Sequence, residues 1–466
     1  MKNHTCPVQA NTMIDNAYKL TDACALASAG LAGSGHGLLR GRVVSVGARA
    51  VEVAGLSHHL SLGDRITLLG RDGRRVPGEI VALHHNRAVV MAFEPPQGLG
   101  PGTTAHGGIG AGSGGLAVSN EWLGRVIDPL GRPLDGRGAL PRGRQNRPLR
   151  AAPPDATQRG RLGPQLNLGV RALDIFTPCR RGQRLGLFAG PGVGKSTLLA
   201  MLARSAGGDV TILALVGERG REVREFLEDE LGMSALQRCV VVVATSDATP
   251  LLRREAAYAA VTIAEFFRDA GRHVLLLMDS VTRFCLALRE IALGAGEPPA
   301  TRGYPASVFA ELPRLLERAG PGPLGADAPG DITAFFTVLV EGDDFNEPVA
   351  DATRGFLDGH VILDRRIAEA GRYPAIDVLR SLSRTAPPGQ PADDAALVRR
   401  ARRILANHAD IIDLVRLGAY RAGSDPAADE ALAAAPRVEA VLRQSPDETA
   451  TVPESFAALR VALAGE

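Results

Sequence analysis

Between about residues 37 and 104, short runs of apolar and β-branched residues alternate with the turn-forming residues Gly, Asp and Asn. Each run has the length of a β-strand, and five or six strands at this spacing are typical of a small barrel. The runs are Arg42–Val46, Ala50–Val53, Arg65–Leu69, Gly78–Leu83 and Ala88–Phe93. We therefore expect a β-barrel domain over residues 37–108, preceded by a partly flexible segment, residues 1–36.

Further along the chain, strand-length runs that are apolar throughout alternate with stretches of helical composition. The predicted strands are Arg184–Ala189, Val210–Val216, Cys239–Ala244, His273–Met278 and Asp331–Val340. Predicted helices lie between them at Ser196–Ser205, Glu222–Leu231 and Leu251–Arg268. Continuous apolar strands that alternate with helices are typical of a parallel sheet covered on both faces. We expect an α/β domain over residues 109–385, with a linker at its start.

The remainder of the chain, residues 386–466, has helical composition throughout. Apolar residues recur there at spacings of four and three, which places them on one face of a helix. They are Leu397, Ala401, Ile404, His408, Ile411 and Val415. We therefore expect a C-terminal helical domain in which this face packs against the core.

Composition excludes several classes of protein. A chain of 466 residues predicts two or three domains, and an apolar fraction of 45% supports real cores. A net charge of +2 does not by itself indicate a nucleic-acid partner. No run of 18 apolar residues occurs, and Asp15 and Asp22 interrupt the first thirty residues, so neither a membrane span nor a signal peptide is expected. The five cysteines are scattered and never spaced as C-x-x-C, which favours a reducing cytoplasm.

One connecting segment is strongly basic. Arg137 to Arg161 contains seven arginines, several prolines and one acidic residue, Asp155. A solvated connector is the favoured interpretation, and contact with phosphate or with acidic lipid is the alternative.

The rarity of lysine draws attention to one position. Of 53 basic residues only Lys2, Lys19 and Lys195 are lysines, so 50 are arginines and the body of the chain has a single lysine. That lysine follows a predicted strand and a glycine loop and opens a predicted helix. Such a loop lets backbone N–H groups and the positive end of a helix approach a polyphosphate. The loop residues expected to bind nucleotide are Gly190, Pro191, Gly192, Val193, Gly194, Lys195, Ser196 and Thr197.

Within this loop, Lys195 is expected to reach the β- and γ-phosphates and Ser196 to hold Mg²⁺. The planar fork of an arginine would not replace the compact charge of a lysine. The usual pattern G-x-x-x-x-G-K-[ST] is met except at its first glycine, which is Ala189 here.

Two carboxylates follow other predicted strands. Asp279 ends the most apolar strand, where it would organise Mg²⁺ through water; the alternative is an ordinary helix cap before Val281. Glu218 follows another strand between glycines, where it would polarise a water against the γ-phosphate; the alternative is a solvated charge cluster.

Several long motifs resemble one family. They are AGPGVGKST, GERGREVREF, LLLMDSVTRF, EPPATRGYPASVFAELPRLLERAG, EGDDFNEPVADATRGFLDGHVILDR, GRYPAIDVLRSLSRT and NHADIIDLVRLGAYRAGSDP. Together they resemble the flagellar and type III secretion ATPases, relatives of the catalytic subunit of the rotary ATP synthase. The resemblance runs from about residue 37 to residue 442. FNEPVADATRG, LDRRIAEAGRYP and the NHAD to GAYRAGSD stretch are more similar to the flagellar branch.

The resemblance implies a RecA-like P-loop core and a role for individual residues. Residues 190–197 would be the phosphate loop, Glu218 the catalytic glutamate and Asp279 the Walker B aspartate. Arg219 matches the arginine beside the catalytic glutamate, and Arg283 matches a position near the γ-phosphate.

Two more residues take roles from the resemblance. Tyr373 matches the aromatic that stacks on adenine, with a core tyrosine as the alternative. Arg384 matches an arginine finger that reaches into the site of the neighbouring subunit. From composition alone it is one of fifty arginines, and an ordinary surface arginine is the alternative.

The implied function is ATP hydrolysis, with Mg²⁺, by a homohexamer at the base of the flagellar export apparatus. The implied partners are a stator-like regulator, a coiled-coil stalk protein, the export gate and chaperone–substrate complexes. The implied location is cytoplasmic, peripheral to the inner face of the bacterial cytoplasmic membrane, with a peripheral membrane contact and no nucleic acid.

Three alternatives stay open from the sequence. A virulence type III secretion ATPase shares the mechanism. An RNA-dependent hexameric helicase shares the core but needs stacking aromatics near its N-terminus, and residues 1–121 contain only Tyr18 and Phe93. A non-catalytic ring subunit of the ATP synthase type carries Gln at the position of Glu218.

Overall fold

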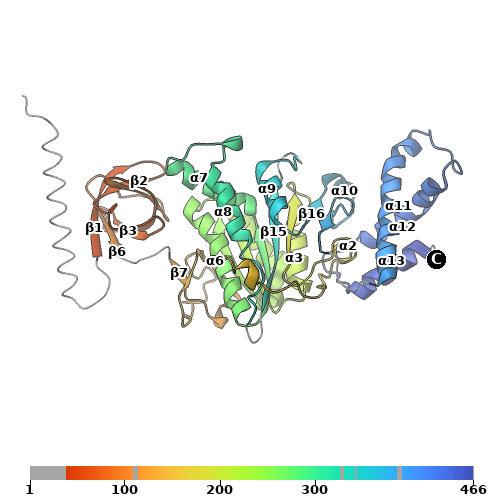
Figure 1. Cartoon of the computed structure of the whole chain (residues 1–466), viewed down its shortest axis with the longest axis horizontal. Helices are drawn as coiled ribbons and strands as arrows, with labels where there is room; N and C mark the ends of the chain where they lie inside the picture. Colours follow the sequence, from red (N-terminus) through yellow and green to blue (C-terminus); the bar gives the residue numbers. More distant parts are fainter. Residues whose placement is uncertain are drawn as a thin grey trace, which may run out of the picture.

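The chain forms three bodies in a row, seen in a computed structural model that describes residues 38–108, 114–325, 330–340, 342, 344–385 and 391–464. A β-barrel lies at one end, an α/β domain in the middle and a helical region at the other end (Figure 1). This confirms the predicted fold class. The predicted N-terminal segment lies outside the described residues. No helix of the described chain is long and apolar enough to cross a membrane.

The barrel closes in the strand order β1-β2-β5-β4-β3-β6, with all neighbours antiparallel. Alternate residues such as Val53, Leu68 and Val90 fill its interior. The sixth strand is rich in glycine, and a Cβ on Gly107 would lie 2.7 Å from a methyl carbon of Leu60. The strands are β1 (Leu38–Val46), β2 (Val51–Ala54), β3 (Arg65–Leu69), β4 (Arg75–His84), β5 (Arg87–Ala92) and β6 (Thr104–Gly108).

A long connector leads from the barrel into the α/β domain. It contributes β7 (Gly115–Leu116), η1 (Asn120–Trp122), β8 (Arg125–Ile127), β9 (Arg147–Pro148), η2 (Ala156–Gln158) and the short helix α2 (Arg171–Phe176). The arginine-rich segment is more tightly held than a solvated connector. Arg147 pairs with Asp269 at 2.6 Å, Arg150 with Glu79 at 2.7 Å, and Arg159 with Glu317 at 3.3 Å.

The central sheet has the strand order β17-β16-β10-β15-β13-β11-β12-β8, and β14 pairs with β15 off this path. The pairings are parallel except those of β14 and β17, which are antiparallel. The strands are β10 (Arg184–Ala189), β11 (Val210–Glu218), β12 (Cys239–Thr245), β13 (His273–Asp279), β14 (Gly320–Pro321), β15 (Asp331–Leu339), β16 (Gly359–Leu363) and β17 (Leu382–Ser383).

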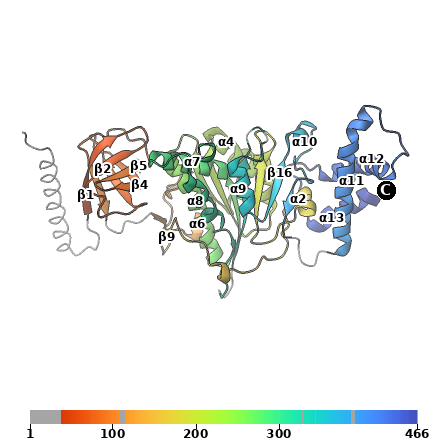
Figure 2. The same ribbon diagram turned by 45° about the horizontal axis from the view of Figure 1, so that its top comes forward.

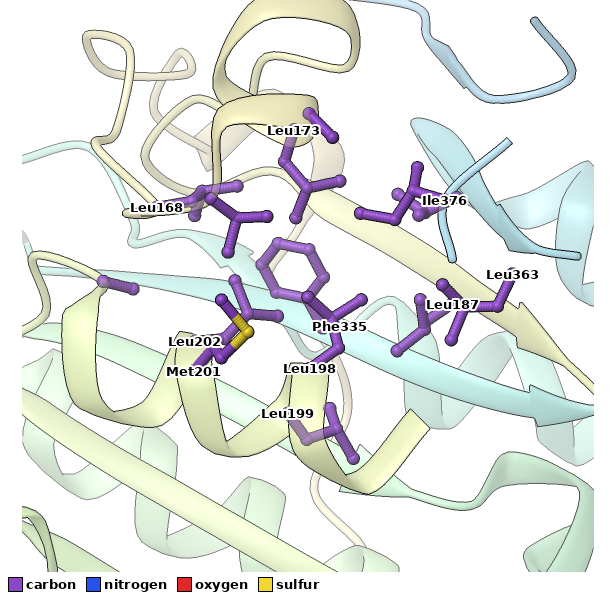
Figure 3. Packing of buried hydrophobic residues seen from close by; sticks show 14 of the residues in the cluster. Leu168, Leu173, Leu187, Leu198, Leu199, Met201, Leu202, Phe335, Leu363 and Ile376 are labelled. Carbon is purple, nitrogen blue, oxygen red and sulfur yellow. The ribbon is translucent and has the colours of Figure 1, made fainter. Parts of the chain in front are cut away.

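Helices cover both faces of this sheet (Figure 2), and alternate residues of each strand serve the two faces. Leu275 and Leu277 face the cluster that contains α3, whereas Leu276 faces the cluster that contains α6 and α7. Figure 3 shows the first cluster, where Phe335 lies between the Leu168 and Leu173 side chains and helix α3. The helices are α3 (Lys195–Ser205), α6 (Pro250–Asp269), α7 (Val281–Gly294), η4 (Thr301–Gly303), α8 (Ala306–Leu316), α9 (Pro348–Phe356) and α10 (Arg365–Glu369).

The predicted helix at Glu222–Leu231 is wrong as a single element. The chain instead forms α4 (Gly220–Glu225), one π-helical turn η3 (Phe226–Leu231) and then α5 (Gly232–Leu236). The wider π-turn brings Phe226 and Leu231, five residues apart, into the same buried cluster. Gly232 then takes φ +76°, a conformation that glycine adopts without strain.

Three helices form the C-terminal region: α11 (Ala392–Arg416), α12 (Pro426–Leu442) and α13 (Val452–Ala464). In the predicted core-facing stripe of α11, Ala401 and Ile404 are buried. The later stripe residues His408, Ile411 and Val415 are half-buried, because the last turns extend beyond the packed cluster. Leu414, which lies off the stripe, and Leu417, just after the helix, are exposed. The predicted stripe is therefore the less exposed face of α11, and it is fully buried at Ala401 and Ile404.

Candidate functional site

The glycine loop connects the C-terminal end of β10 to the first turn of α3. Gly192 and Gly194 have φ +74° and +88°, and a Cβ on Gly192 would meet nothing within 4 Å. Gly194 is the N-cap of α3, so the free N–H groups of the first turn stay directed out of the helix. Ala189 is buried and pairs with Leu339 and Leu363 on the two flanking strands. This position closes a strand, so the loop does not need a glycine there.

Lys195 and two carboxylates meet at the edge of the sheet where these strands end. The Lys195 Nζ lies 2.5 Å from Asp279 Oδ1 and 3.6 Å from Glu218 Oε1. The strands β11 and β13 are direct neighbours, with Leu215 opposite Asp279, which places the two acidic side chains side by side. All three side chains are largely buried. The structure thus brings the three principal residues of the predicted site together.

Burial and mutual charge shift the ionisation of this cluster. Burial raises the pKa of Glu218, the charge of Asp279 raises it further, and Lys195 and Arg283 only partly oppose this rise. Burial alone would lower the pKa of Lys195, but the charges of Asp279 and Glu218 outweigh it, so the pKa of Lys195 is raised. A cationic lysine therefore faces a carboxyl group that takes up a proton more readily than an exposed glutamate. Such a group is suited to accept a proton from water.

A cavity of about 110 Å³ opens beside the cluster. Ser196 and Asp279 line it together with residues of the helical segment that follows Glu218. Its lining residues are Ser196, Leu215, Glu218, Glu222, Val223, Glu225, Phe226, Glu230 and Asp279. Glu222, Glu225 and Glu230 were not among the residues predicted from sequence. The signal that could have found Glu222 is its place in the motif GERGREVREF, four residues after Glu218.

The remaining arginines of the predicted site differ in their placement. The Cβ, Cγ and Cδ atoms of Arg283 lie against Gly217, where an added Cβ would be 3.1–3.3 Å from them. Arg283 therefore adjoins Glu218, the residue after Gly217. Its buried Nε has no hydrogen-bond partner in the described chain. Arg219 points into solvent instead and pairs with Glu222 at 3.2 Å. The structure does not bring Arg219 into the cluster.

Tyr373 lies against the phosphate loop although it is far away in sequence. A Cβ on Gly194 would contact its ring at 3.5 Å, and 45% of the tyrosine surface is exposed. A half-exposed ring beside the loop is accessible to a planar base, whereas a core tyrosine would be buried.

Arg384 lies at the opposite end of the sheet. Its backbone N–H donates to the carbonyl of Asp358 (2.8 Å), whose carboxylate accepts from the N–H of Arg184, the first residue of β10. The phosphate loop follows the last residue of β10, five residues away, which is roughly 16 Å along a strand. Arg384 is exposed and does not reach the loop of its own subunit.

The glycine loop, the lysine at the start of α3 and the carboxylates on neighbouring strand ends define the class of protein. This is a P-loop nucleoside triphosphatase with a RecA-like core. Three family models match the chain. Residues 40–106 match the β-barrel domain of the ATP synthase alpha/beta family, residues 169–383 its nucleotide-binding domain, and residues 391–461 the T3SS EscN ATPase C-terminal domain.

Known proteins narrow the class further. The flagellum-specific ATP synthase of Caulobacter vibrioides is 50% identical over 428 residues, which cover 91% of this chain and 96% of the relative. The flagellum-specific ATP synthase of Salmonella typhimurium is 45% identical, covering 90% and 92%. The type 3 secretion system ATPase of Xanthomonas euvesicatoria is 47% identical, covering 88% and 90%. Among solved structures, the assembled ATPase EscN of enteropathogenic E. coli superimposes with a TM-score of 0.82 at 37% identity, covering 91% of this chain and all of EscN.

The chain therefore belongs to the family of flagellum-specific and type III secretion ATPases. This confirms the resemblance seen in its motifs and the assignment as an ATPase. Membership in this family also argues against the alternative of an RNA-dependent hexameric helicase. The roles of the individual site residues stay predictions.

Proposed function

We propose that this chain hydrolyses ATP to ADP and phosphate as the subunit of a homohexameric motor that energises flagellar type III protein export. The observation that carries the proposal is the buried cluster of Lys195, Glu218 and Asp279 beside the glycine loop. A non-catalytic ring subunit would not need Glu218, whose raised pKa suits a general base.

The donor set of the cavity fits Mg²⁺. The carboxylate of Asp279 and the hydroxyl of Ser196 line the same cavity, and oxygen atoms are the ligands that Mg²⁺ prefers. Bound there, Mg²⁺ would supply charge that neutralises the phosphate oxygens.

The chain's own groups perform the remaining steps. The backbone N–H groups of the loop and the first turn of α3 bind the phosphates, and Lys195 turns from the carboxylates towards them. Glu218 orients a water in the cavity and accepts its proton as the terminal phosphoryl group is attacked. Tyr373 stacks on the adenine, and Arg283 adds positive charge beside Glu218.

Arg384 completes the site only in a ring. It lies at the far end of the sheet from its own loop, so it contributes to a site only if it reaches the loop of a neighbouring subunit. EscN, the similar solved structure, has been described as an assembled ATPase and in complex with its central stalk EscO. By analogy we assign this chain to a homohexamer and place a coiled-coil stalk against the exposed end of α11, where Leu414 and Leu417 would contact it.

The other partners and the cellular location follow from the same family. They are a stator-like regulator, the export gate and chaperone–substrate complexes, with the ring peripheral to the inner face of the cytoplasmic membrane. The high identity to flagellum-specific relatives supports the flagellar branch. A virulence relative at 47% identity keeps that branch as the second candidate. Deletion of the gene decides between them: loss of motility with intact effector secretion is expected, and the reverse would assign the chain to the virulence system.

The enzymatic proposal is tested with Glu218→Gln. The substitution keeps a polar side chain of the same size but removes the proton acceptor, so ATP should stay bound and turnover should fall by at least about 100-fold. Phosphate release and binding of a fluorescent ATP analogue measure the two properties separately.

Glu228→Gln is the matched control, because Glu228 is exposed on the helical segment that follows Glu218 and pairs only with Arg224 in the described chain. Its turnover should equal that of the parent. Parental turnover by Glu218→Gln would refute the assignment of the general base.

A further inference from the structure

A buried threonine contacts the proposed Walker B aspartate. Thr337 lies on β15, the strand next to β13, and is fully buried. Its hydroxyl donates a hydrogen bond of 2.7 Å to Asp279 Oδ1. The neighbours of Thr337 along the strand, Phe336 and Val338, are apolar. A hydroxyl in such a strand is costly to bury unless it is hydrogen-bonded, and its partner here belongs to the site.

Asp279 uses its two oxygens differently. Oδ1 accepts from Thr337 and from the Lys195 Nζ, at 2.7 and 2.5 Å. Oδ2 has no hydrogen bond within the described residues, while the Asp279 side chain lines the cavity together with Ser196. The two donors on Oδ1 therefore fix the rotation of the carboxylate and leave Oδ2 for a ligand in the cavity.

Of these two donors, Lys195 is also expected to bind the phosphates. Lys195 is expected to turn towards the phosphates when nucleotide binds, and Asp279 Oδ1 then keeps Thr337 as its neutral, immobile donor. β15 lies inside the sheet between β10 and β13, so the backbone that carries Thr337 is held on both sides. A donor on such a strand keeps its position while Lys195 moves.

We infer that Thr337 is a positioning residue that holds the Asp279 carboxylate in the orientation that binds hydrated Mg²⁺ once Lys195 has engaged the phosphates. The inference rests on the proposed function, because it gives Thr337 a role only if Asp279 serves the metal. The inference adds to the site a residue of β15, and none of the family motifs quoted above includes Thr337.

The test compares Thr337→Val, which keeps the shape of the side chain without the hydroxyl, with Thr337→Ser, which keeps the hydroxyl. ATPase rates of the full-length protein are measured while Mg²⁺ is varied at fixed ATP. A hydrogen bond to a charged group is lost in the valine variant, so the Mg²⁺ concentration for half-maximal rate should rise by about ten-fold or more. The serine variant should recover most of this loss, and binding of a fluorescent ATP analogue in EDTA should be unchanged in both.

Thr333→Val is the matched control. Thr333 is also fully buried on β15, but its hydroxyl accepts from the N–H of Gly182 and contacts His273 at the other end of the strand. Like Thr337→Val, this variant loses a threonine hydroxyl from β15, but it should keep the dependence on Mg²⁺ of the parent protein. Thermal unfolding of all variants reports whether the valine substitutions fold.

The outcomes separate the inference from the proposed function. If the parent shows no Mg²⁺-dependent ATPase, the proposed function fails. If the parent is active and folded Thr337→Val needs no more Mg²⁺ than the parent, the inference is overturned. It is also overturned if Thr333→Val changes the Mg²⁺ dependence as much, because the effect is then one of general packing.

Discussion

At the scale of single residues, the proposed general base sits where its charged form is disfavoured. Burial and the charge of Asp279 raise the pKa of Glu218, so this carboxyl group holds a proton more tightly in the folded protein than an exposed glutamate does. A group of this kind lowers stability as pH rises from its unfolded pKa through its raised folded pKa. The same shift makes it a better proton acceptor, which is the usual exchange of stability for activity at such a site.

The first prediction concerns pH. Glu218 must be ionised to accept a proton, so kcat/KM should fall as pH decreases through the raised pKa of Glu218. The midpoint of this acid limb should lie above 4.5, the ordinary value for glutamate. ATPase rates at limiting ATP between about pH 5 and pH 8, at constant ionic strength, measure it. An activity that stays constant down to the ordinary glutamate range would contradict the role of Glu218.

The second prediction concerns the single lysine in the body of the chain. Lys195→Arg keeps the positive charge, but the planar guanidinium is too large for the narrow space between Asp279, Glu218 and the loop. Turnover should therefore fall by at least about 100-fold, as it should in Lys195→Ala, although arginine should retain more of the folded stability. Phosphate release and urea denaturation measure the two effects. Near-parental turnover of Lys195→Arg would mean that any cation suffices there.

At the scale of helices and strands, the apolar runs predicted the central strands closely. Val210–Val216 was predicted where β11 spans Val210–Glu218, and Arg184–Ala189 matches β10. Strands covered on both faces are apolar throughout, which makes them visible in a sequence. The short edge strands β8 and β17 were not predicted, because two or three residues carry no pattern.

Contacts across the sheet could not be predicted in the same way. The strand order β10-β15-β13-β11 decides that Thr337 meets Asp279, and no local pattern encodes that order. The π-turn after Glu225 was missed because its composition is that of an ordinary helix. The sequence pattern could predict the positions of Lys195, Glu218 and Asp279, because each comes at or after the end of an apolar strand. Arg384 is one of fifty arginines and was found through family resemblance alone.

The proposed adenine-stacking loop is tied to the C-terminal helices. The carbonyl of Tyr373 accepts from the N–H of Gln444 (2.9 Å), just beyond the end of α12. The buried Gln444 side chain donates to the carbonyls of Gly169 and Glu448, each at 2.7 Å, and accepts from the N–H of Arg171. Gln444 thus contacts the loop that carries Tyr373 through its backbone N–H, and it joins the segment before α2 to the end of α12 through its side chain.

The third prediction follows from this junction. Gln444→Ala leaves two carbonyls and one N–H without their partner, which should cost about 1–3 kcal/mol of unfolding free energy. The backbone N–H that donates to Tyr373 remains, but the side chain no longer fixes its position, so KM for ATP should rise more than kcat falls. Urea denaturation and steady-state kinetics measure these changes. Gln237→Ala, at an exposed glutamine, is the control, and a loss of kcat without a change in KM would contradict the junction.

At the scale of the whole molecule, the barrel is fixed to the α/β domain by a buried ionic network. Arg254 on α6 bonds Glu79 of the barrel and Glu255, each at 2.5 Å, and Glu255 also pairs with Arg65 of the barrel. Arg254 and both glutamates are almost completely buried, so removal of one partner would leave an uncompensated charge. Barrel and ATPase domain therefore move together, and a ring formed through one also aligns the other.

The proposed ring would give Arg384 a function that the single chain cannot. Within one subunit it lies beside Asp358, at the end of the sheet away from the phosphate loop. If it serves the site of a neighbour, each active site contains Lys195 from one subunit and Arg384 from the next. ATPase activity per subunit should then rise steeply with protein concentration, because assembly completes the site.

The final prediction uses this division directly. Arg384→Ala and Lys195→Ala should each be inactive alone, since an arginine finger contributes about 10³–10⁵ in rate and the lysine binds the phosphates. In mixed rings, some interfaces join an intact loop to an intact finger, so mixing should restore part of the activity, up to about a quarter of the sites in an equal mixture that assembles at random.

Arg399→Ala, at an exposed arginine of α11, replaces Arg384→Ala in a control whose activity should simply follow the fraction of active subunits. Cross-linking with differently tagged subunits establishes that mixed rings form. If such rings stay inactive, Arg384 does not act in trans, and the site must be completed by residues of one chain.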